Sequence, residues 1–387
     1  MSHSNKPWEN PVSLRNDVQN SSNAEGGGER ERLSRRLFVA GAGALGFAAP
    51  LGYLGMAHAL TGSGAGALKD AFDNLPICTR TAAGAAEFDG PPRAIKLAWN
   101  ATAICTSAAP VAKERGFFAK HNLDVEFVNF GGSTEQLLEA IATGKADAGI
   151  GMALRWLKPL EQGFDVRITA GIHGGCLRLL GSKAAGIDSL EALKGKTIAI
   201  SDQASPTKNF FMIYLQKKGI DPDSVEWRQY PSNLLALAVE KGEAHALADA
   251  DPLTYVWLKE GKLSEIATNL SEEYAHRTCC VLAIRGGLVR DQKPVATALT
   301  RAVLEAGDHV GHDPADAAAL FSAYGGKGSV EDLTAMLRSQ THNHHPLGAD
   351  LKEQIALYAE ELKLVKVFKP STDVSKFAER VYADVLS

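Results

Sequence analysis

The sequence has few cysteines, few aromatic residues and no strong excess of charge. Five cysteines occur in 387 residues, aromatic residues make up 7% of the chain, and the formal net charge is −4. No basic stripe or basic patch with interleaved aromatic residues is present, so the sequence does not indicate nucleic-acid binding. The cysteine spacing fits no zinc-finger pattern. The hydrophobic content of 45% and charged content of 22% are ordinary for a globular protein.

Long apolar runs are also absent after residue 60, where no stretch is long enough to cross a membrane. The single long run, residues 40–60, follows Arg35-Arg36 and contains the small-x-small site Ala57-His58-Ala59. Paired arginines before a glycine-rich apolar run are typical of a twin-arginine signal peptide. We therefore expect the twin-arginine export machinery to carry the folded chain out of the cytoplasm, with a mature N-terminus near Leu60. The alternative is a retained membrane anchor, which the many glycines disfavour.

The length left after such a signal exceeds a comfortable single core, so two lobes are expected. Short apolar strands alternate with amphipathic helices from Arg93, and the same rhythm restarts at Thr197. The expected elements include a helix over 108–121, a strand over 123–129 and a helix over 253–259. This alternation predicts an α/β fold in which each lobe is a mostly parallel sheet flanked by helices. Two extended apolar runs, residues 166–180 and 279–284, would connect the lobes in the manner of a clamp.

The domain limits follow from these patterns. A disordered leader with the signal peptide occupies 1–59, and an irregular leader of the mature chain occupies 60–92. Lobe 1 comprises 93–180 and 278–387, including the C-terminal helices, and lobe 2 (181–277) is inserted within it. In such sheets, ligands bind at the carboxyl ends of the strands, so the loops of the two lobes should line a common cleft.

Several phrases resemble periplasmic solute-binding proteins of ABC transporters. Residues 112–118 with 123–126 resemble the family's opening "A-x-x-x-G-F-F…G-L-x-V-E", and 131–133 with 140–149 resemble its second signature. Residues 190–199 and 236–246 resemble phrases of the second lobe, although His245 stands where the family often has Asp. The similarity is to the nitrate/sulfonate/taurine/bicarbonate and thiamine-precursor binding class.

The resemblance implies a protein that captures a small-molecule ligand in the cleft and presents it to an ABC permease in the inner membrane. It would be periplasmic, would use no cofactor and would not be an enzyme. A periplasmic ligand- or metal-sensing protein is the alternative, as is a thiamine-pyrimidine-synthase-like enzyme on the same fold.

The candidate ligand-binding residues lie on polar loops that follow predicted strands. Free N–H groups at the helix starts after residues 107 and 133 could hold an anion, and glycines allow close approach of a ligand to the backbone. Asp202, Asp249 and Asp251 also lie on cleft loops, and Asp251 is expected to start a helix. Several carboxylates favour a cationic, zwitterionic or metal ligand over a bare oxyanion. The candidates are Asn100, Thr102, Cys105, Gly132, Ser133, Met152, His173, Cys176, Asp202, Ser205, Asn233 and Asp249.

The cysteines are the most unusual feature. Cys105 lies on a cleft loop, Cys176 in one crossing and Cys279-Cys280 in the other. Two interpretations remain open. Thiolates and the imidazole of His173 could hold a soft metal or a thiol-bearing ligand, or a disulfide from Cys176 to Cys279 or Cys280 could brace the hinge.

A second cluster, His342 to His345, could supply imidazoles to the cleft or bind metal at the surface. A solvated loop is the simpler interpretation of this cluster. The sequence does not name a metal.

The export signal is directly testable. Replacing Arg35 and Arg36 together with lysine should block export, because the twin-arginine route requires both side chains. Cell fractionation and N-terminal sequencing of the exported native chain would check the route and the cleavage site near Leu60. Normal export of the double variant would contradict the twin-arginine assignment.

Overall fold

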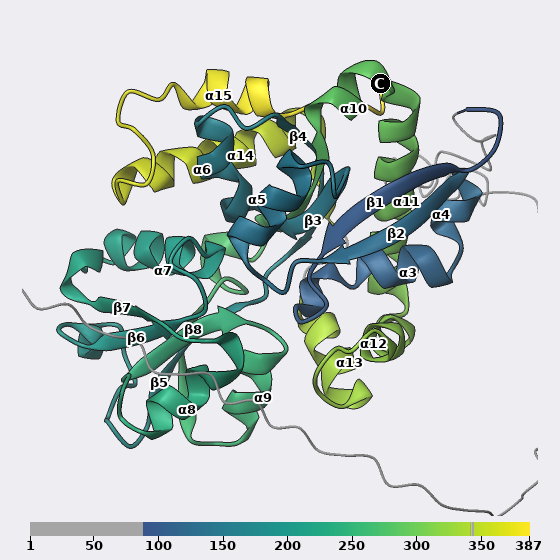
Figure 1. Ribbon diagram of the computed structural model, residues 1–387. Helices are drawn as coiled ribbons and strands as arrows, with labels where there is room; N and C mark the ends of the chain where they lie inside the picture. Colours follow the sequence, from purple (N-terminus) through teal and green to yellow (C-terminus); the bar gives the residue numbers. More distant parts are fainter. Residues whose placement is uncertain (1–87, 341, 343) are drawn as a thin grey trace, which may run out of the picture. The chain divides into compact units, whose positions relative to one another are not determined.

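The computed structural model describes residues 88–340, 342 and 344–387 (Figure 1). The predicted signal peptide, most of the predicted irregular leader and Cys78 lie outside these residues. All described residues belong to one unit, Gly64–Ser387. Within this described part, no helix is both long enough and apolar enough to span a membrane.

The first sheet has five strands in the order β2-β1-β3-β10-β4. They are β1 (Arg93–Trp99), β2 (Leu123–Asn129), β3 (Ala148–Met152), β4 (Val166–Gly174) and β10 (Thr278–Arg285). Strand β1 runs parallel to β2 and β3, whereas β10 is antiparallel to both of its neighbours. Every residue of β3 and nearly every residue of β4 and β10 is buried, because helices cover both faces of the sheet.

The second sheet repeats this plan with the strand order β7-β6-β8-β5-β9. Its strands are β5 (Leu177–Ser182), β6 (Thr197–Ile200), β7 (Glu226–Gln229), β8 (Ala246–Ala250) and β9 (Leu263–Thr268). Strand β6 is parallel to β7 and β8, and β5 is antiparallel to β8 and β9. The predicted α/β class, with mostly parallel sheets flanked by helices, is confirmed.

The chain crosses between the sheets twice. The first crossing lies between Gly174 and Leu177, because β5 pairs within the second sheet. The predicted extended run 166–180 is therefore two strands in two sheets, and the crossing precedes the predicted limit at residue 180. The second crossing lies between β9, which the sequence patterns did not predict, and β10.

Helices cover both faces of the first sheet (Figure 1). On one face lie α3 (Ala108–Glu114), α4 (Phe117–Lys120) and α11 (Lys293–His312). On the other lie α5 (Thr134–Ala142), α6 (Ala153–Glu161), α14 (Gly348–Leu364) and α15 (Val374–Val381). The single helix predicted for 108–121 is two helices, since Gly116 adopts a left-handed φ of +77° that interrupts the helix.

The second sheet packs against α7 (Pro206–Lys217), α8 (Leu235–Glu240) and α9 (Leu253–Lys259). Figure 1 shows α7 on the opposite side of this sheet from α8 and α9. After β10 the chain is helical, as predicted, and adds α10 (Gly286–Asp291), α12 (Pro314–Ala323) and α13 (Val330–Ser339).

A buried ion pair fixes the start of α9. The Asp251 carboxylate is fully buried and accepts hydrogen bonds from Arg178 Nε at 2.9 Å and Nη2 at 3.1 Å, and from Thr254 Oγ1 at 2.6 Å. Arg178 lies on β5, so this pair joins the first strand of the second sheet to the loop after β8. Asp251 therefore stabilises the loop between β8 and α9. Its position just before α9 agrees with the helix start predicted from the sequence.

Replacing Asp251 with alanine should lower the free energy of unfolding by about 3 kcal/mol, because it leaves the buried Arg178 guanidinium with Glu265 as its one remaining carboxylate among the described residues. Denaturant unfolding would measure the change. The matched control is Asp249→Ala, which removes a carboxylate two residues away that faces a pocket. Equal losses in the two variants would contradict the structural role of Asp251.

Candidate functional site

A pocket of about 310 Å³ lies between the loops of the two sheets. The first sheet contributes loops that follow β1, β2 and β3. These loops supply Asn100, Thr102, Ala103, Gly131, Gly132, Ser133, Glu135, Met152 and Arg155. All of them follow the carboxyl end of a strand or open the next helix, which is where open parallel sheets bind ligands.

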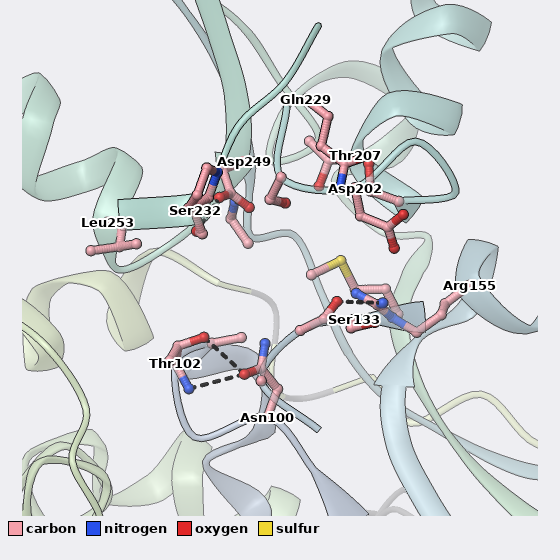
Figure 2. A pocket seen from close by; sticks show the side chains of 18 of the residues that line it. Asn100, Thr102, Ser133, Arg155, Asp202, Thr207, Gln229, Ser232, Asp249 and Leu253 are labelled. Atoms are coloured by element: carbon pink, nitrogen blue, oxygen red, sulfur yellow. Dashed lines mark hydrogen bonds between the residues drawn. The ribbon is translucent and has the colours of Figure 1, made fainter. Parts of the chain in front are cut away.

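The second sheet contributes the loops that follow β6, β7 and β8, which are the equivalent strands in its order. These loops supply Ser201, Asp202, Ser205, Thr207, Gln229, Pro231, Ser232, Asp249, Ala250 and Leu253. Figure 2 shows Asp249, Ser232 and Asp202 across the pocket from Asn100, Thr102 and Ser133. A molecule in this pocket would contact both lobes.

Eight of the twelve predicted ligand residues line the pocket: Asn100, Thr102, Gly132, Ser133, Met152, Asp202, Ser205 and Asp249. Asn233 does not, and its side chain is exposed beside the lining residue Ser232. Cys105, His173 and Cys176 lie in a separate buried cluster, described below. That any of these residues binds a ligand stays a prediction.

The floor of the pocket on the first sheet is a tightly packed pair of loops. Asn100 Oδ1 accepts hydrogen bonds from the Thr102 backbone N at 3.1 Å and from Thr102 Oγ1 at 2.8 Å. Gly132 has a φ of +85°, and a Cβ atom there would lie 3.3 Å from Asn100 Nδ2. Both its conformation and its contact therefore favour glycine, which places the adjacent backbone against the pocket.

Arg155 is the main pocket residue that the sequence analysis missed. It lies in the first turn of α6, is 5% exposed, and its Nη1 donates to the Gly132 carbonyl at 2.6 Å and to Thr134 Oγ1 at 2.7 Å. Its buried Nε has no hydrogen-bond partner. Burial lowers the pKa of Arg155 and Asp202 opposes that shift, but arginine remains charged in proteins. An arginine three residues after the buried strand 148–152 was the sequence feature that could have indicated this residue.

Asp202 joins the two sides of the pocket. Its Oδ2 accepts from the Thr134 backbone N at 3.2 Å, and its Oδ1 accepts from the Ala204 N at 2.9 Å. Thr134 Oγ1 also donates to the Ala204 carbonyl at 3.4 Å. The first turn of α5 is thus hydrogen-bonded directly to the loop after β6, which closes one edge of the pocket.

Asp249 lies on the opposite wall at the end of β8. It accepts hydrogen bonds from Ser232 Oγ at 2.7 Å and from the Ala250 backbone N at 2.9 Å. Burial raises the pKa of this carboxyl, and the hydrogen bonds only partly offset the shift. Ser205 has a second role, since its Oγ caps α7 by accepting from the Lys208 N at 3.1 Å.

Behind the pocket floor lies a buried cluster of four cysteines and His173. Cys105, Cys176, Cys279 and Cys280 are free thiols with at most 5% exposure. The sulfur atoms of Cys176 and Cys279 are 3.6 Å apart. Hydrogen bonds from neighbouring thiols hold the pKa of Cys105 and Cys279 below the ordinary range, while those of Cys176 and Cys280 are raised.

The predicted histidine cluster separates in the structure. The His342 ring lies 5.7 Å from the His173 ring, and burial together with His173 lowers the pKa of His342 to about 3. His344 and His345 instead lie near Asp350 and Asp308, at 3.3 and 3.0 Å. One of these imidazoles, that of His342, therefore lies near the buried cysteines. No described histidine lines the pocket.

The two sheets and their connections form the periplasmic-binding-protein fold. The family described as NMT1/THI5 like matches residues 107–317, and the chain belongs to this family. The resemblance predicted from the sequence phrases is confirmed. A comparison with curated proteins gives no match.

Solved structures share the fold at low sequence identity. The alkanesulfonate-binding protein SsuA from Xanthomonas axonopodis pv. citri, bound to MOPS, is 17% identical, with a TM-score of 0.64 over 75% of this chain and 99% of its own. The periplasmic nitrate-binding protein NrtA from Synechocystis PCC 6803 is 16% identical, with a TM-score of 0.65 over 77% and 88%. The periplasmic aliphatic sulphonate-binding protein SsuA from Escherichia coli is 16% identical, with a TM-score of 0.63 over 76% and 93%.

The raised pKa of Asp249 predicts a stability cost at neutral pH. A raised folded-state pKa means that the folded chain binds the proton more tightly than the unfolded chain, so stability falls as pH rises above about 3.9, the ordinary aspartate pKa. Asp249→Asn should therefore be more stable than the native protein at pH 7, and this difference should shrink towards about pH 3.

Denaturant unfolding across this pH range would measure the effect. The control is Asp188→Asn, which changes an exposed aspartate and should leave the pH profile unchanged. An Asp249→Asn protein that is less stable than the native protein at neutral pH would show that the ionised carboxylate is stabilising.

Proposed function

We propose that the protein is the extracytoplasmic substrate-binding component of an ABC import system and captures a small molecule between its two lobes. The observation that carries the proposal is a pocket built from loops of both sheets, at the carboxyl ends of equivalent strands. A ligand that contacts both lobes stabilises the closed arrangement, and closure is the signal that such a protein can present to a permease.

The charges in the pocket indicate the ligand class. Arg155 is a buried cation whose Nε has no partner, so it can receive an anionic group. Asp202, Asp249 and Glu135 supply carboxylates in the same pocket, and a bare anion would meet their repulsion. A small zwitterion, with its anionic end at Arg155 and its cationic end at Asp249, satisfies both. The neighbours reported above are named for sulfonate and nitrate, which are anions, and one of them is bound to MOPS, an amino sulfonate.

The pocket supports binding over catalysis. The described lining residues include no histidine, lysine or cysteine, so the lining provides neither the histidine that a thiamine-pyrimidine-synthase-like reaction would consume nor an amine nucleophile. The inner-membrane permease, the periplasmic location and the twin-arginine route belong to the same proposal. A sensor would use the same pocket, and adjacent permease and ATPase genes would support transport over sensing.

A thermal-shift screen of small amino acids and amino sulfonates, each compared with its deaminated anion, would test the ligand class. The zwitterions should raise the melting temperature and the matched anions should not. With the ligand so identified, Arg155→Lys and Asp249→Asn should each weaken binding roughly tenfold to a hundredfold, the equivalent of about 1–3 kcal/mol per lost contact.

Calorimetry would measure these affinities, with Asp188→Asn as the surface control. Ser205→Ala should weaken binding and also cost about 1 kcal/mol of stability, because it removes the cap of α7. Selective binding of the anions, or native affinity in both charge variants, would contradict the proposed ligand class. Recovery of a chemically altered ligand would contradict a binding function.

A further inference from the structure

We infer that Cys105, His173 and Cys280 form a binding site for a thiophilic divalent metal ion such as Zn²⁺, separate from the ligand pocket. The two sulfur atoms and one imidazole nitrogen lie within 4.8 Å of one another, and all three residues are buried. Thiolate and imidazole are the ligands that zinc prefers, at about 2.3 and 2.0 Å. In a tetrahedral zinc site the ligand atoms lie about 3.3–3.8 Å apart, so the three donors need to approach one another by at most roughly 1 Å to bind one ion.

His173 provides the observation that points to a metal. Its side chain is 2% exposed, and its Nδ1 lies 3.1 Å from the Gly174 carbonyl, to which it can only donate. In the neutral imidazole, which is the form that binds a metal, the proton therefore lies on Nδ1 and Nε2 carries the lone pair. This buried Nε2 makes no hydrogen bond. A backbone carbonyl that fixes the tautomer of a histidine is the usual support of a metal-ligating imidazole.

Charge balance favours a divalent ion in this place. When Cys105 and Cys280 bind Zn²⁺, each thiol loses its proton to solvent, and the two thiolates neutralise the ion. The site then carries no net charge, which suits a location where the three ligands are at most 3% exposed.

Two further thiols and a second imidazole adjoin the three proposed ligands. The thiols of Cys176 and Cys279 form a neighbouring pair 3.6 Å apart. The His342 ring lies 5.7 Å from that of His173, and its Nε2 is also buried without a partner. The cluster thus contains two imidazoles whose Nε2 atoms lack hydrogen bonds: that of His173, the proposed ligand, and that of His342 beside it.

The site would join three segments that are distant in the sequence. Cys105 follows β1, His173 ends β4, and Cys280 lies opposite both His173 and Met152 in the first sheet. β4 and β10 are the strands at the two crossings, and Met152 lines the ligand pocket. Bound metal would therefore tie both crossings together immediately behind the pocket floor.

Titration of the reduced, metal-free full chain with Co²⁺ under anaerobic conditions would test the site. One equivalent should produce a thiolate-to-cobalt charge-transfer band, and Zn²⁺ should abolish it by displacement. Removal of an outer-shell partner costs roughly tenfold to a hundredfold in metal affinity, so losing a direct ligand should cost at least about a hundredfold. We expect this loss in Cys105→Ser, His173→Gln and Cys280→Ser.

Asp188→Asn is the control, since it changes an exposed residue and keeps every thiol and imidazole of the cluster; its metal affinity should equal that of the native protein. Should the serine variants not fold, alkylation mapping of the native chain by mass spectrometry replaces them, and Zn²⁺ should protect Cys105 and Cys280. No cobalt band in the reduced chain, equal affinity in all variants, or no protection of these two thiols would overturn the proposal.

Discussion

The antiparallel pairing of β10 with β3 and β4 is the constraint on which the rest of the structure depends. Strand β10 returns the chain from the second sheet to the first sheet. There it lies between β3 and β4, which both run in the opposite direction. Its register places Cys280 opposite Met152 and His173. The same pairing therefore positions a pocket residue, one end of each crossing and the buried thiol cluster.

The sheet order explains why two unrelated stretches of chain build one pocket. In β2-β1-β3 and β7-β6-β8 alike, the first strand of the unit lies between the second and the third. The carboxyl ends of these strands present their loops on one edge of each sheet, and α5 meets the loop after β6 through Thr134 and Asp202. The first lobe supplies Arg155 to this pocket and the second lobe supplies Asp202 and Asp249, so the proposed recognition of a zwitterion would require both lobes.

The α/β fold and most of its elements could be predicted because strand and helix periodicity are local properties of the sequence. Helix Leu253–Lys259 and strand Leu123–Asn129 have the predicted bounds. The pocket loops could also be placed, since ligands of such sheets lie beyond strand ends. The break at Gly116 and the division of 166–180 could not, because a left-handed glycine and membership of a particular sheet depend on tertiary packing.

The missed residues have a common physical reason. Arg155 sits in a helix that reads as amphipathic, and only its contacts with Gly132 and Thr134 turn it inward. Cys105 was placed in the cleft because its loop is there, but its side chain points behind the floor, into the thiol cluster. Position along a loop can be inferred from sequence; the face to which a side chain points is set by the neighbouring loops.

The raised pKa of Asp249, on the wall of the pocket, would affect how a bound ligand is released. Its pKa is raised in the empty pocket, and a cationic group placed beside it would stabilise the ionised form and so lower that pKa. At a pH low enough to protonate Asp249 in the empty pocket, capture of such a molecule would release a proton, so acid would oppose capture by mass action. A cationic ligand held beside Asp249 would therefore be bound more weakly in acid, where the carboxyl keeps its proton.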